Sequence, residues 1–307
     1  MSLTRTDLKL LREIAELEKT PEGAYNIRKN GEPAGRASTE NITISPKSDR
    51  PGIDITVKDG TKNESVHIPV ILTRTGYTES VYNDFYIGDG CDVLIVAGCG
   101  IHNGGCGTTQ HDGIHTFHIG KNSRVRYVEK HYGEGKGTGE KIMNPKTVAY
   151  VGEGSFLQMD TSQIGGVDST DRMTEIHVGK DAEAVVNEKL MTHGSQTADS
   201  GMEIDLEGEG SSGRVISRSV AKDSSVQKFF PKMVGKAACF GHVQCDSIIM
   251  NDAKISSIPA ISAESIDAVL IHEAAIGKIA GDQLLKLMTL GLDETQAEER
   301  ILEGFLS

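Results

Sequence analysis

The amino-acid sequence predicts a mainly β protein built as a β-solenoid, with a short helix before the solenoid and a helical segment after it. Three observations predict this fold. A strand–glycine–strand pattern recurs four times through the middle of the chain. The composition combines 35 glycines with only 5% aromatic residues and no tryptophan, which suits a repetitive strand-rich fold better than a compact α/β enzyme. Apolar residues at helical spacing occur near the two ends.

A short amphipathic helix is predicted over residues 7–18. Leucine and isoleucine recur there at positions 10, 11, 14 and 17, which lie on one stripe of a helix. Thr4, with Asp7 three residues later, resembles a capping box, which satisfies free backbone N–H groups at a helix start. A connector rich in Pro, Gly and Asn follows from about residue 21 to residue 48. The first segment is therefore predicted to span residues 1–30.

The repeated pattern is a short strand, a turn glycine, two polar or glycine residues, a small residue and a second alternating strand. The turn glycines follow one another at steps of 32, 32 and 27 residues, at Gly88, Gly120, Gly152 and Gly179. The small residue suits a bend where neighbouring coils crowd, at Cys91, Ser123, Ser155 and Ala182. We expect strands of four to six residues, two short coils in each step, and a solenoid over residues 31–274.

A β-sandwich is the alternative fold, because it also combines alternating strands with turns. We favour the solenoid, since units that repeat at this spacing bury their apolar faces by stacking on their neighbours.

The pattern changes after residue 264. Residues 267–273 are predicted to form a last strand, and residues 276–290 a helix that ends at Gly291. Asp293 with Gln296 predicts the start of a second helix, whose apolar stripe comprises Ala297, Ile301, Leu302 and Phe305. We expect this segment, residues 275–307, to cap the last coil against edge-to-edge aggregation and to offer a docking face.

The charge and cysteine content restrict the class of protein. The formal net charge is −12, which disfavours non-specific binding to nucleic acid or to an anionic membrane. No stretch approaches the roughly 20 apolar residues that span a bilayer, and the start of the chain lacks the apolar region of a signal peptide. We therefore expect a cytoplasmic location, where five reduced cysteines favour metal or sulfur chemistry over disulfides. Buried cysteines are also ordinary small apolar residues.

The strongest local signal for chemistry lies at residues 238–250 and 270–279. One further solenoid step from Cys245 would bring His272 and Glu273 near it. Thiolate, imidazole and carboxylate together can hold iron and accept sulfur, and His272 could favour the thiolate form of Cys245. On spacing alone we favour the simpler alternative, in which Cys245 is a buried stack residue and His272 and Glu273 face solvent.

Long ordered strings in the second half of the chain resemble the SufB/SufD family of the SUF system of iron–sulfur cluster assembly. They are Gly-His-Val-Gln-Cys-Asp-Ser at 241–247, Ala-Val-Leu-Ile-His-Glu-Ala-Ala-Ile-Gly-Lys-Ile at 268–279, and Tyr-Val-Glu-Lys-His-Tyr-Gly-Glu-Gly at 127–135. The similarity covers about residues 80–307. It is specific, because whole strings match rather than one short pattern.

The resemblance implies a right-handed parallel β-helix and a non-catalytic scaffold that binds a transient iron–sulfur cluster, with iron alone as a further candidate. It also implies three partners. These are a SufC-type ABC ATPase on the C-terminal helices, a second protomer (the same chain or a SufB/SufD-like one) at whose interface clusters form, and a sulfur donor protein. The family's essential cysteine falls on Cys245, its carboxylate on Glu273 and the SufD-type histidine on His272.

Two departures from the family pattern bear on the assembly. The chain is shorter than typical SufB, and no position here matches the family's upstream sulfur-receiving cysteine. The chain also combines the Cys and Glu of SufB with the His of SufD. In this combination the chain resembles the compact archaeal or anaerobic-type version of the family, in which one scaffold polypeptide forms a homodimer with two ATPase subunits.

A second group of candidate ligands lies at residues 99–118. Four of the ten histidines and two of the five cysteines fall in these twenty residues. Such density can form a divalent-metal site, with Cys99, His102, Cys106, His111 and His115 as its candidates. Because strand residues alternate between faces and the segment is rich in glycine, we favour a polar loop or an interface ladder.

Two other functions stay open. One is a stand-alone metalloenzyme that uses residues 99–118 and turns over without an ATPase partner. The other is an extracellular-type β-helix carbohydrate enzyme, which the lack of an export signal disfavours. Residues 98–105 lack the GxxxxGK[ST] order, so any ATPase activity is expected in a separate chain.

Overall fold

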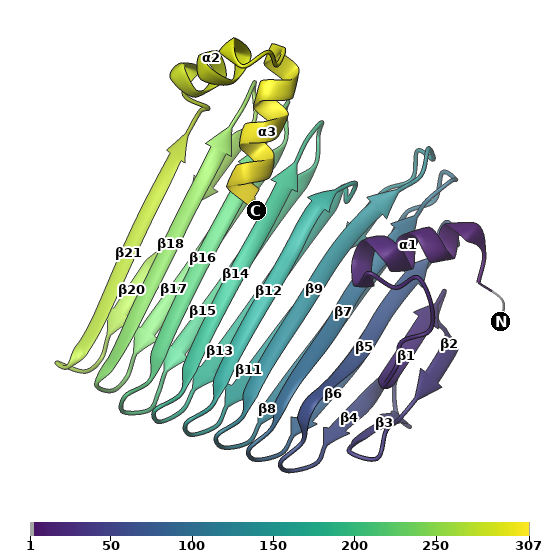
Figure 1. Ribbon diagram of the computed structural model, residues 1–307, viewed down its shortest axis with the longest axis vertical. Coiled ribbons are helices and arrows are strands. Elements are labelled where there is room, and N and C mark those ends of the chain that lie inside the picture. Colours follow the sequence, from purple (N-terminus) through teal and green to yellow (C-terminus); the bar gives the residue numbers. More distant parts are fainter. Residues whose placement is uncertain (1–2, 307) are drawn as a thin grey trace.

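The computed structural model describes residues 3–306, so residues 1–2 and 307 of the two predicted terminal segments lie outside it. The chain winds into a flattened β-solenoid of about eight turns, with a short helix at the N-terminal end and two helices at the C-terminal end (Figure 1). Successive long strands alternate between two facing sheets. The predicted mainly β solenoid is confirmed.

The sheets, here called A and B, each run the length of the molecule. Sheet A has ten strands, in the order β2 (Glu32–Ala37), β1 (Ala24–Lys29), β5 (Lys62–Leu72), β7 (Asp92–His102), β9 (Arg124–Glu134), β12 (Phe156–Gly165), β14 (Glu183–Thr192), β16 (Ser212–Ala221), β18 (Cys239–Ile249) and β21 (Ala268–Gly277). Sheet B comprises β3 (Ile42–Pro46), β4 (Gly52–Val57), β6 (Thr78–Ile87), β8 (Thr109–Ile119), β10 (Lys141–Met143), β11 (Lys146–Val151), β13 (Ser169–Val178), β15 (Thr197–Leu206), β17 (Val226–Gly235), β19 (Lys254–Ser257) and β20 (Ala260–Ala263).

Strand pairing distinguishes this fold from a sandwich. Each coil pairs with the next in parallel, as β14 does with β16 and β16 with β18. The antiparallel pairs β1–β2 and β3–β4 lie at the N-terminal end. A β-sandwich is built from antiparallel sheets, so the alternative fold is excluded.

The expected strand length was wrong. One step of the pattern is a single coil, not two, and most of its strands have ten or eleven residues. In two coils the sheet B strand is divided into shorter pieces, β10 with β11 and β19 with β20. Gly98 and Gly100 lie inside β7. A Cβ atom at Gly98 would come within 2.7 Å of the backbone oxygen of Ile14. These glycines therefore let the N-terminal helix lie close to the strand instead of ending it.

The turn glycines lie where sheet B passes into sheet A, directly after β6, β8, β11 and β13. A Cβ atom at Gly120 would lie 2.8 Å from the backbone carbon of Gly88 in the preceding coil. The small residues next to the turns also join the coils: the backbone N–H of Cys91 donates to Ser123 Oγ, and that of Ser123 donates to Ser155 Oγ. Coil stacking thus explains both features of the repeat.

The interior has an apolar half and a polar half. The apolar half lies beside the glycine turns, where Phe117 stacks on Phe85 at 4.2 Å and meets the edge of Tyr127 at 5.0 Å. All three rings are fully buried. The other half of the interior contains buried histidines, carboxylates, arginines and serines. Candidate chemistry is therefore inside the solenoid as well as on it.

Helix α1 (Arg5–Ala15) packs on the outer face of sheet A across β5, β7 and β9. It has the predicted capping box, in which Thr4 and Asp7 bond to each other's backbone N–H. Leu10 and Ile14 are fully buried against the sheet. The helix ends earlier than predicted, at the left-handed residue Glu16.

Helices α2 (Gly281–Thr289) and α3 (Glu294–Leu306) end the described chain. Strand β21 extends four residues beyond the predicted end at Glu273 and through Ile276, so the helix starts later than expected. Asp293 and Gln296 bond to each other's backbone N–H groups, as predicted. None of the described helices is long and apolar enough to cross a membrane.

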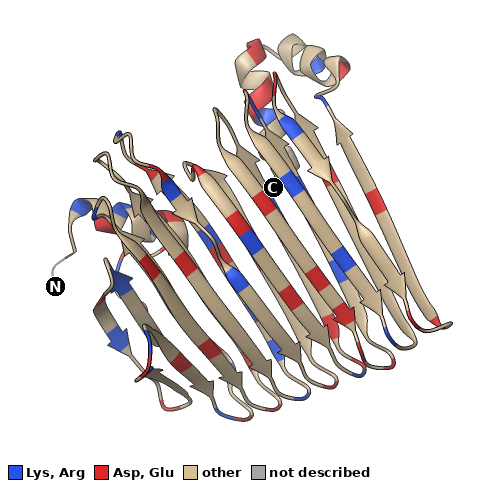
Figure 2. Cartoon of the chain, turned by 180° about the vertical axis from the view of Figure 1, so that it is seen from behind, with Lys and Arg blue, Asp and Glu red and all other residues tan. Residues whose placement is uncertain are grey.

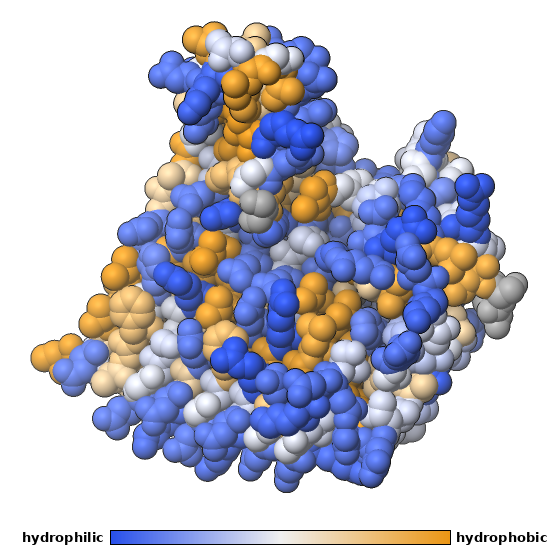
Figure 3. All heavy atoms as spheres, viewed as in Figure 1, coloured by the Kyte–Doolittle hydropathy of each residue, from blue (hydrophilic) through white to orange (hydrophobic). Residues whose placement is uncertain are grey.

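The C-terminal helices leave the last coil open. Helix α3 folds back over sheet A, on the same side as α1, where Leu302 and Leu306 pack against Val220 of β16 (Figure 1). Helix α2 contacts α3 and has no buried residue. Apolar side chains of the final coil are exposed, at Ile258, Ile261, Ile266, Val269, Ile271 and Ile276. Figure 3 shows such apolar surface over this coil and on the C-terminal helices.

Candidate functional site

Cys245 faces the polar half of the interior. It occupies an inward position of β18, where alternate residues are buried, and is only 3% exposed. Strand register places it beside Ser217 of β16 and Ala274 of β21. A small cavity joins it to Glu188 of β14. The thiol therefore lies inside the solenoid, one strand from the open end.

The structure brings His272 to Cys245 but leaves Glu273 apart. His272 Nε2 lies 3.7 Å from Cys245 Sγ. Glu273 is exposed on the other face of β21, with Oε2 3.5 Å from His242 Nε2. Consecutive strand residues point to opposite faces, so one strand cannot direct both side chains to the same thiol. The three predicted side chains thus form an inner pair, Cys245 with His272, and an outer pair, Glu273 with His242.

Burial sets the resting protonation of the inner pair. Burial raises the pKa of Cys245 to about 11. Burial, and then the neighbouring His242, lower the pKa of His272. The pair at neutral pH is a thiol beside a neutral imidazole, in which His272 can accept the thiol proton. The expected thiolate is not the resting state, because an uncharged imidazole does not offset the cost of burying an anion.

The group predicted at residues 99–118 is divided between the interior and the surface. Cys99, His111 and His115 line a small cavity in the polar half. His102 lies at the end of β7, 3.1 Å from Glu134, and Cys106 is exposed in the loop before β8. The alternation of faces along the strands separates these residues, as the sequence indicated.

Sequence reasoning missed the partners of the interior histidines. Glu129 Oε1 of β9 lies 3.4 Å from His131 Nε2 and 3.9 Å from His115 Nε2. Glu79 of β6 lies 3.3 Å from His111 Nδ1. The coil step would have found one of these contacts directly, because residues 32 positions apart are register partners and Glu79 is the partner of His111. The same step places Glu129 beside Ala97 and His131 beside Cys99.

The interior charges favour an ion-pair network over a metal centre. Burial opposes ionisation of Glu129, yet His131 and Arg172 hold its pKa below the ordinary range. Burial raises the pKa of Cys99 well above its usual value. Among the described residues, one group of three His, Cys, Asp or Glu side chains has its ligand atoms within 4.8 Å of one another. That group lies on the outer face of sheet B and contains none of the interior residues. The interior candidates therefore do not form a preorganised metal site.

Acid is expected to destabilise the protein through His115. Burial lowers the pKa of His115 from 6.5 to about 4. Between these pH values the unfolded chain binds a proton that the folded chain excludes. Stability from this group is therefore complete above pH 6.5, and about 3 kcal/mol of it is lost as the pH falls to 4. Urea unfolding across this pH range should show a smaller loss for His115→Gln than for the wild type.

His118→Gln is the control for this prediction. His118 lies three residues further along β8, on the exposed outer face. It should keep the pH dependence of the wild type. Equal slopes for His115→Gln and the wild type would contradict the assignment of the effect to His115.

Comparison with known proteins identifies the family of this chain. The model of the family described as "SUF system FeS cluster assembly, SufBD core domain" matches residues 85–305, which is most of the chain. The chain belongs to the SufBD family. The match includes the Cys245–His272 pair, the polar interior from β8 onwards and both C-terminal helices.

Three archaeal relatives show the extent of the SufBD similarity, each named an iron–sulfur cluster assembly SufBD family protein. That of Archaeoglobus fulgidus is 29% identical over 78% of this chain and 65% of its own length. That of Methanothermobacter thermautotrophicus is 26% identical over 75% of this chain and 55% of its length. That of Methanocaldococcus jannaschii is 28% identical over 82% of this chain and 79% of its length. The chain thus spans less than two thirds of the first two relatives. Family membership supports a role in iron–sulfur cluster assembly.

Proposed function

We propose that this chain is a non-catalytic scaffold of the SUF machinery that accepts sulfur at Cys245 and carries a nascent iron–sulfur cluster as its cargo. The observation that carries the proposal is the pair of Cys245 and His272, held 3.7 Å apart inside the solenoid beside its open end. All five cysteines are free, which suits the reduced cytoplasmic compartment proposed for it.

Sulfur would be accepted by thiol–persulfide exchange. The Cys245 sulfur attacks the outer sulfur of a donor protein's persulfide, while His272 Nε2 takes the thiol proton. The donor cysteine leaves as a thiolate and Cys245 becomes the persulfide, so the exchange consumes no oxidant. Burial of Cys245 shields that persulfide from reductants in solvent.

A second protomer would cover the last coil. Within the described residues β21 pairs with β18 on one side only, so its other edge has free backbone N–H and C=O groups. Long exposed strand edges favour pairing with another chain. The exposed apolar residues Val269 and Ile271 of β21 add apolar area to this contact. Pairing here would place Cys245 and the outer residue Glu273 near the junction.

Helix α2 would dock the SufC-type ABC ATPase. Its Leu285 is 62% exposed, and Leu290 at its end is 74% exposed. Neither has a partner surface within residues 3–306, where α2 contacts only α3 appreciably. Apolar side chains presented on a helix are suited to insert into a groove of a partner protein.

The assembly is tested by measuring its mass with the purified ABC-type ATPase. We expect two scaffold chains with two ATPase chains. Leu285→Glu should weaken ATPase binding at least about tenfold while the scaffold pair persists, because it puts a charge in the centre of the contact. Gln283→Glu adds the same charge elsewhere on α2 and should bind normally. A scaffold that stays monomeric with the ATPase present would contradict the pairing, and normal binding by Leu285→Glu would contradict the docking face.

A further inference from the structure

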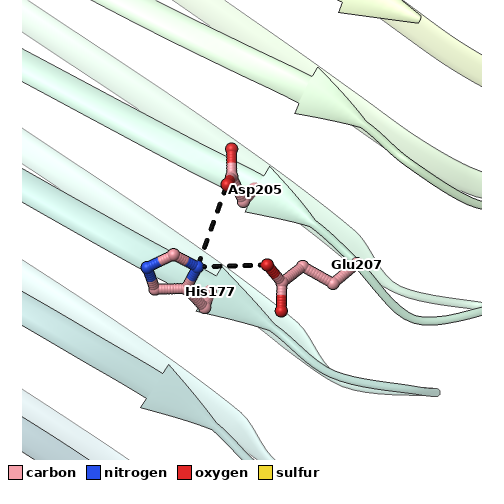
Figure 4. A group of neighbouring side chains, drawn as sticks. All are labelled: His177, Asp205 and Glu207. Carbon is pink, nitrogen blue, oxygen red and sulfur yellow. Dashed lines mark hydrogen bonds and ion pairs between the residues drawn. The ribbon is translucent and has the colours of Figure 1, made fainter. Parts of the chain in front are cut away.

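His177, Asp205 and Glu207 converge on the outer face of sheet B (Figure 4). His177 lies near the end of β13, in register with Asp205 of β15, and Glu207 directly follows β15. His177 Nδ1 is 3.2 Å from Glu207 Oε1 and 3.8 Å from Asp205 Oδ2. Coil stacking therefore brings three metal-ligating side chains together from residues about 30 positions apart.

The histidine ring is held with Nδ1 toward the two carboxylates. It stacks on Tyr150 at 4.9 Å, the last contact in a row of rings that begins with Tyr86 and His118. On its other side, Nε2 lies 2.8 Å from Glu175 Oε1. Assigning the proton of a neutral ring to Nε2, which then donates to Glu175, leaves the Nδ1 lone pair facing Asp205 and Glu207. A carboxylate that accepts from the far nitrogen is the usual support of a metal-binding histidine.

We propose that these three side chains bind one divalent first-row transition ion. Acceptor groups that face one another are stabilised by a cation between them, a position that the Lys236 ammonium group now occupies beside the two carboxylates. An imidazole with two carboxylates suits Fe²⁺, Mn²⁺ or Zn²⁺, and the partial exposure of the site leaves positions for water. That the ion is Fe²⁺ in the cell rests on the proposed function in iron–sulfur assembly. Metal binding itself does not depend on that function.

Lys236 is the competitor for this position. Its Nζ lies 2.6 Å from Asp205 Oδ2 and 3.1 Å from Glu207 Oε1, so the ammonium group neutralises part of the carboxylate charge. The Lys236 side chain is 35% exposed and flexible enough to turn away into solvent. Metal binding would exchange one cation for another, and removing the ammonium group should strengthen it.

The site is separate from Cys245. Its ligands lie on the outer face of sheet B, whereas Cys245 points into the interior from sheet A. Figure 2 shows the acidic and basic residues that are distributed over the sheet B face. The geometry therefore fits a surface metal position that is separate from the proposed cluster site.

The test is a titration of the full chain with Mn²⁺ alone, following the free ion by electron paramagnetic resonance, and then with Fe²⁺ under anaerobic dialysis. We expect one ion per chain. His177→Gln and Asp205→Asn should each weaken binding about 10–100-fold, and Lys236→Met should strengthen it. Glu203→Gln is the matched control, because Glu203 lies on the same strand but pairs with Lys232.

Two results would overturn the proposal. One is unchanged affinity in His177→Gln, and the other is no saturable binding even in Lys236→Met. The titration contains no sulfide, cluster or ATPase. A chain that binds Mn²⁺ here but assembles no cluster would therefore uphold the site and refute the proposed function. A chain that assembles cluster but binds no Mn²⁺ would uphold the proposed function and refute the metal site.

Discussion

Cys245→Ser should lose most of the iron and sulfide that the wild-type chain acquires on anaerobic reconstitution with its ATPase. Cys245 is the described thiol that faces the polar interior next to a histidine at the open end. A serine hydroxyl keeps the size of the side chain but cannot form a persulfide or a thiolate ligand. Iron and sulfide analysis with visible absorption spectroscopy measures the effect.

Cys239→Ser is the matched control for this prediction. Cys239 lies on the same strand and also points inward, but it is the first residue of β18 and is not among the residues that line the cavity beside Cys245. Its substitution should leave cluster content near that of the wild type. If Cys245→Ser acquires as much cluster as the wild type, Cys245 is not the sulfur acceptor.

His272→Gln should slow sulfur acceptance and change its pH profile, which a purely structural role of His272 would not do.

Phe117→Ala should lower the free energy of unfolding by about 3–5 kcal/mol. Phe117 is fully buried between Phe85 of the preceding coil and Tyr127 of sheet A. Removing its ring leaves a cavity in the apolar half of the interior, where side chains of the two sheets pack against each other. Neighbouring coils lose contacts as well, because stacked repeats are stabilised largely through their interfaces.

Urea or guanidinium unfolding measures this loss of stability. Phe230→Ala is the control, since Phe230 is 40% exposed on β17 and its truncation should cost much less. Equal losses from the two substitutions would show that the solenoid does not depend on the buried stack of rings.

The fold was largely predictable because each coil repeats the same turn. Glycines at a near-constant step indicate stacked coils, and the structure shows each of them close to the backbone of the preceding coil. The turn glycines did not reveal that most strands have ten or eleven residues. Two further glycines, Gly98 and Gly100, lie inside a strand because helix α1 packs closely over them. The start of α2 was also missed, because the run through Ile276 is compatible with strand or helix until its neighbours are known.

The sequence predicted which coils bring the candidate site residues together, but not which face of a strand each side chain occupies. The step correctly placed His272 beside Cys245, but the alternation of faces along β21 was not applied to Glu273. The same step relates His177 to Asp205, so the surface site could have been found from register alone. Which half of the interior is polar could not be found in this way, because it depends on which residues of opposite sheets face each other.

The unpaired edge of β21 limits the symmetry that a pair of these chains can have. Two identical edges that join each other do so around a two-fold axis, and the strands at the seam then run antiparallel although those within each chain run parallel. Both sheets would continue from one molecule into the other as a single rod. The two β18 strands would lie three strand spacings apart, about 14 Å. Two thiols at Cys245 would then be equivalent and near enough to serve one cargo between them.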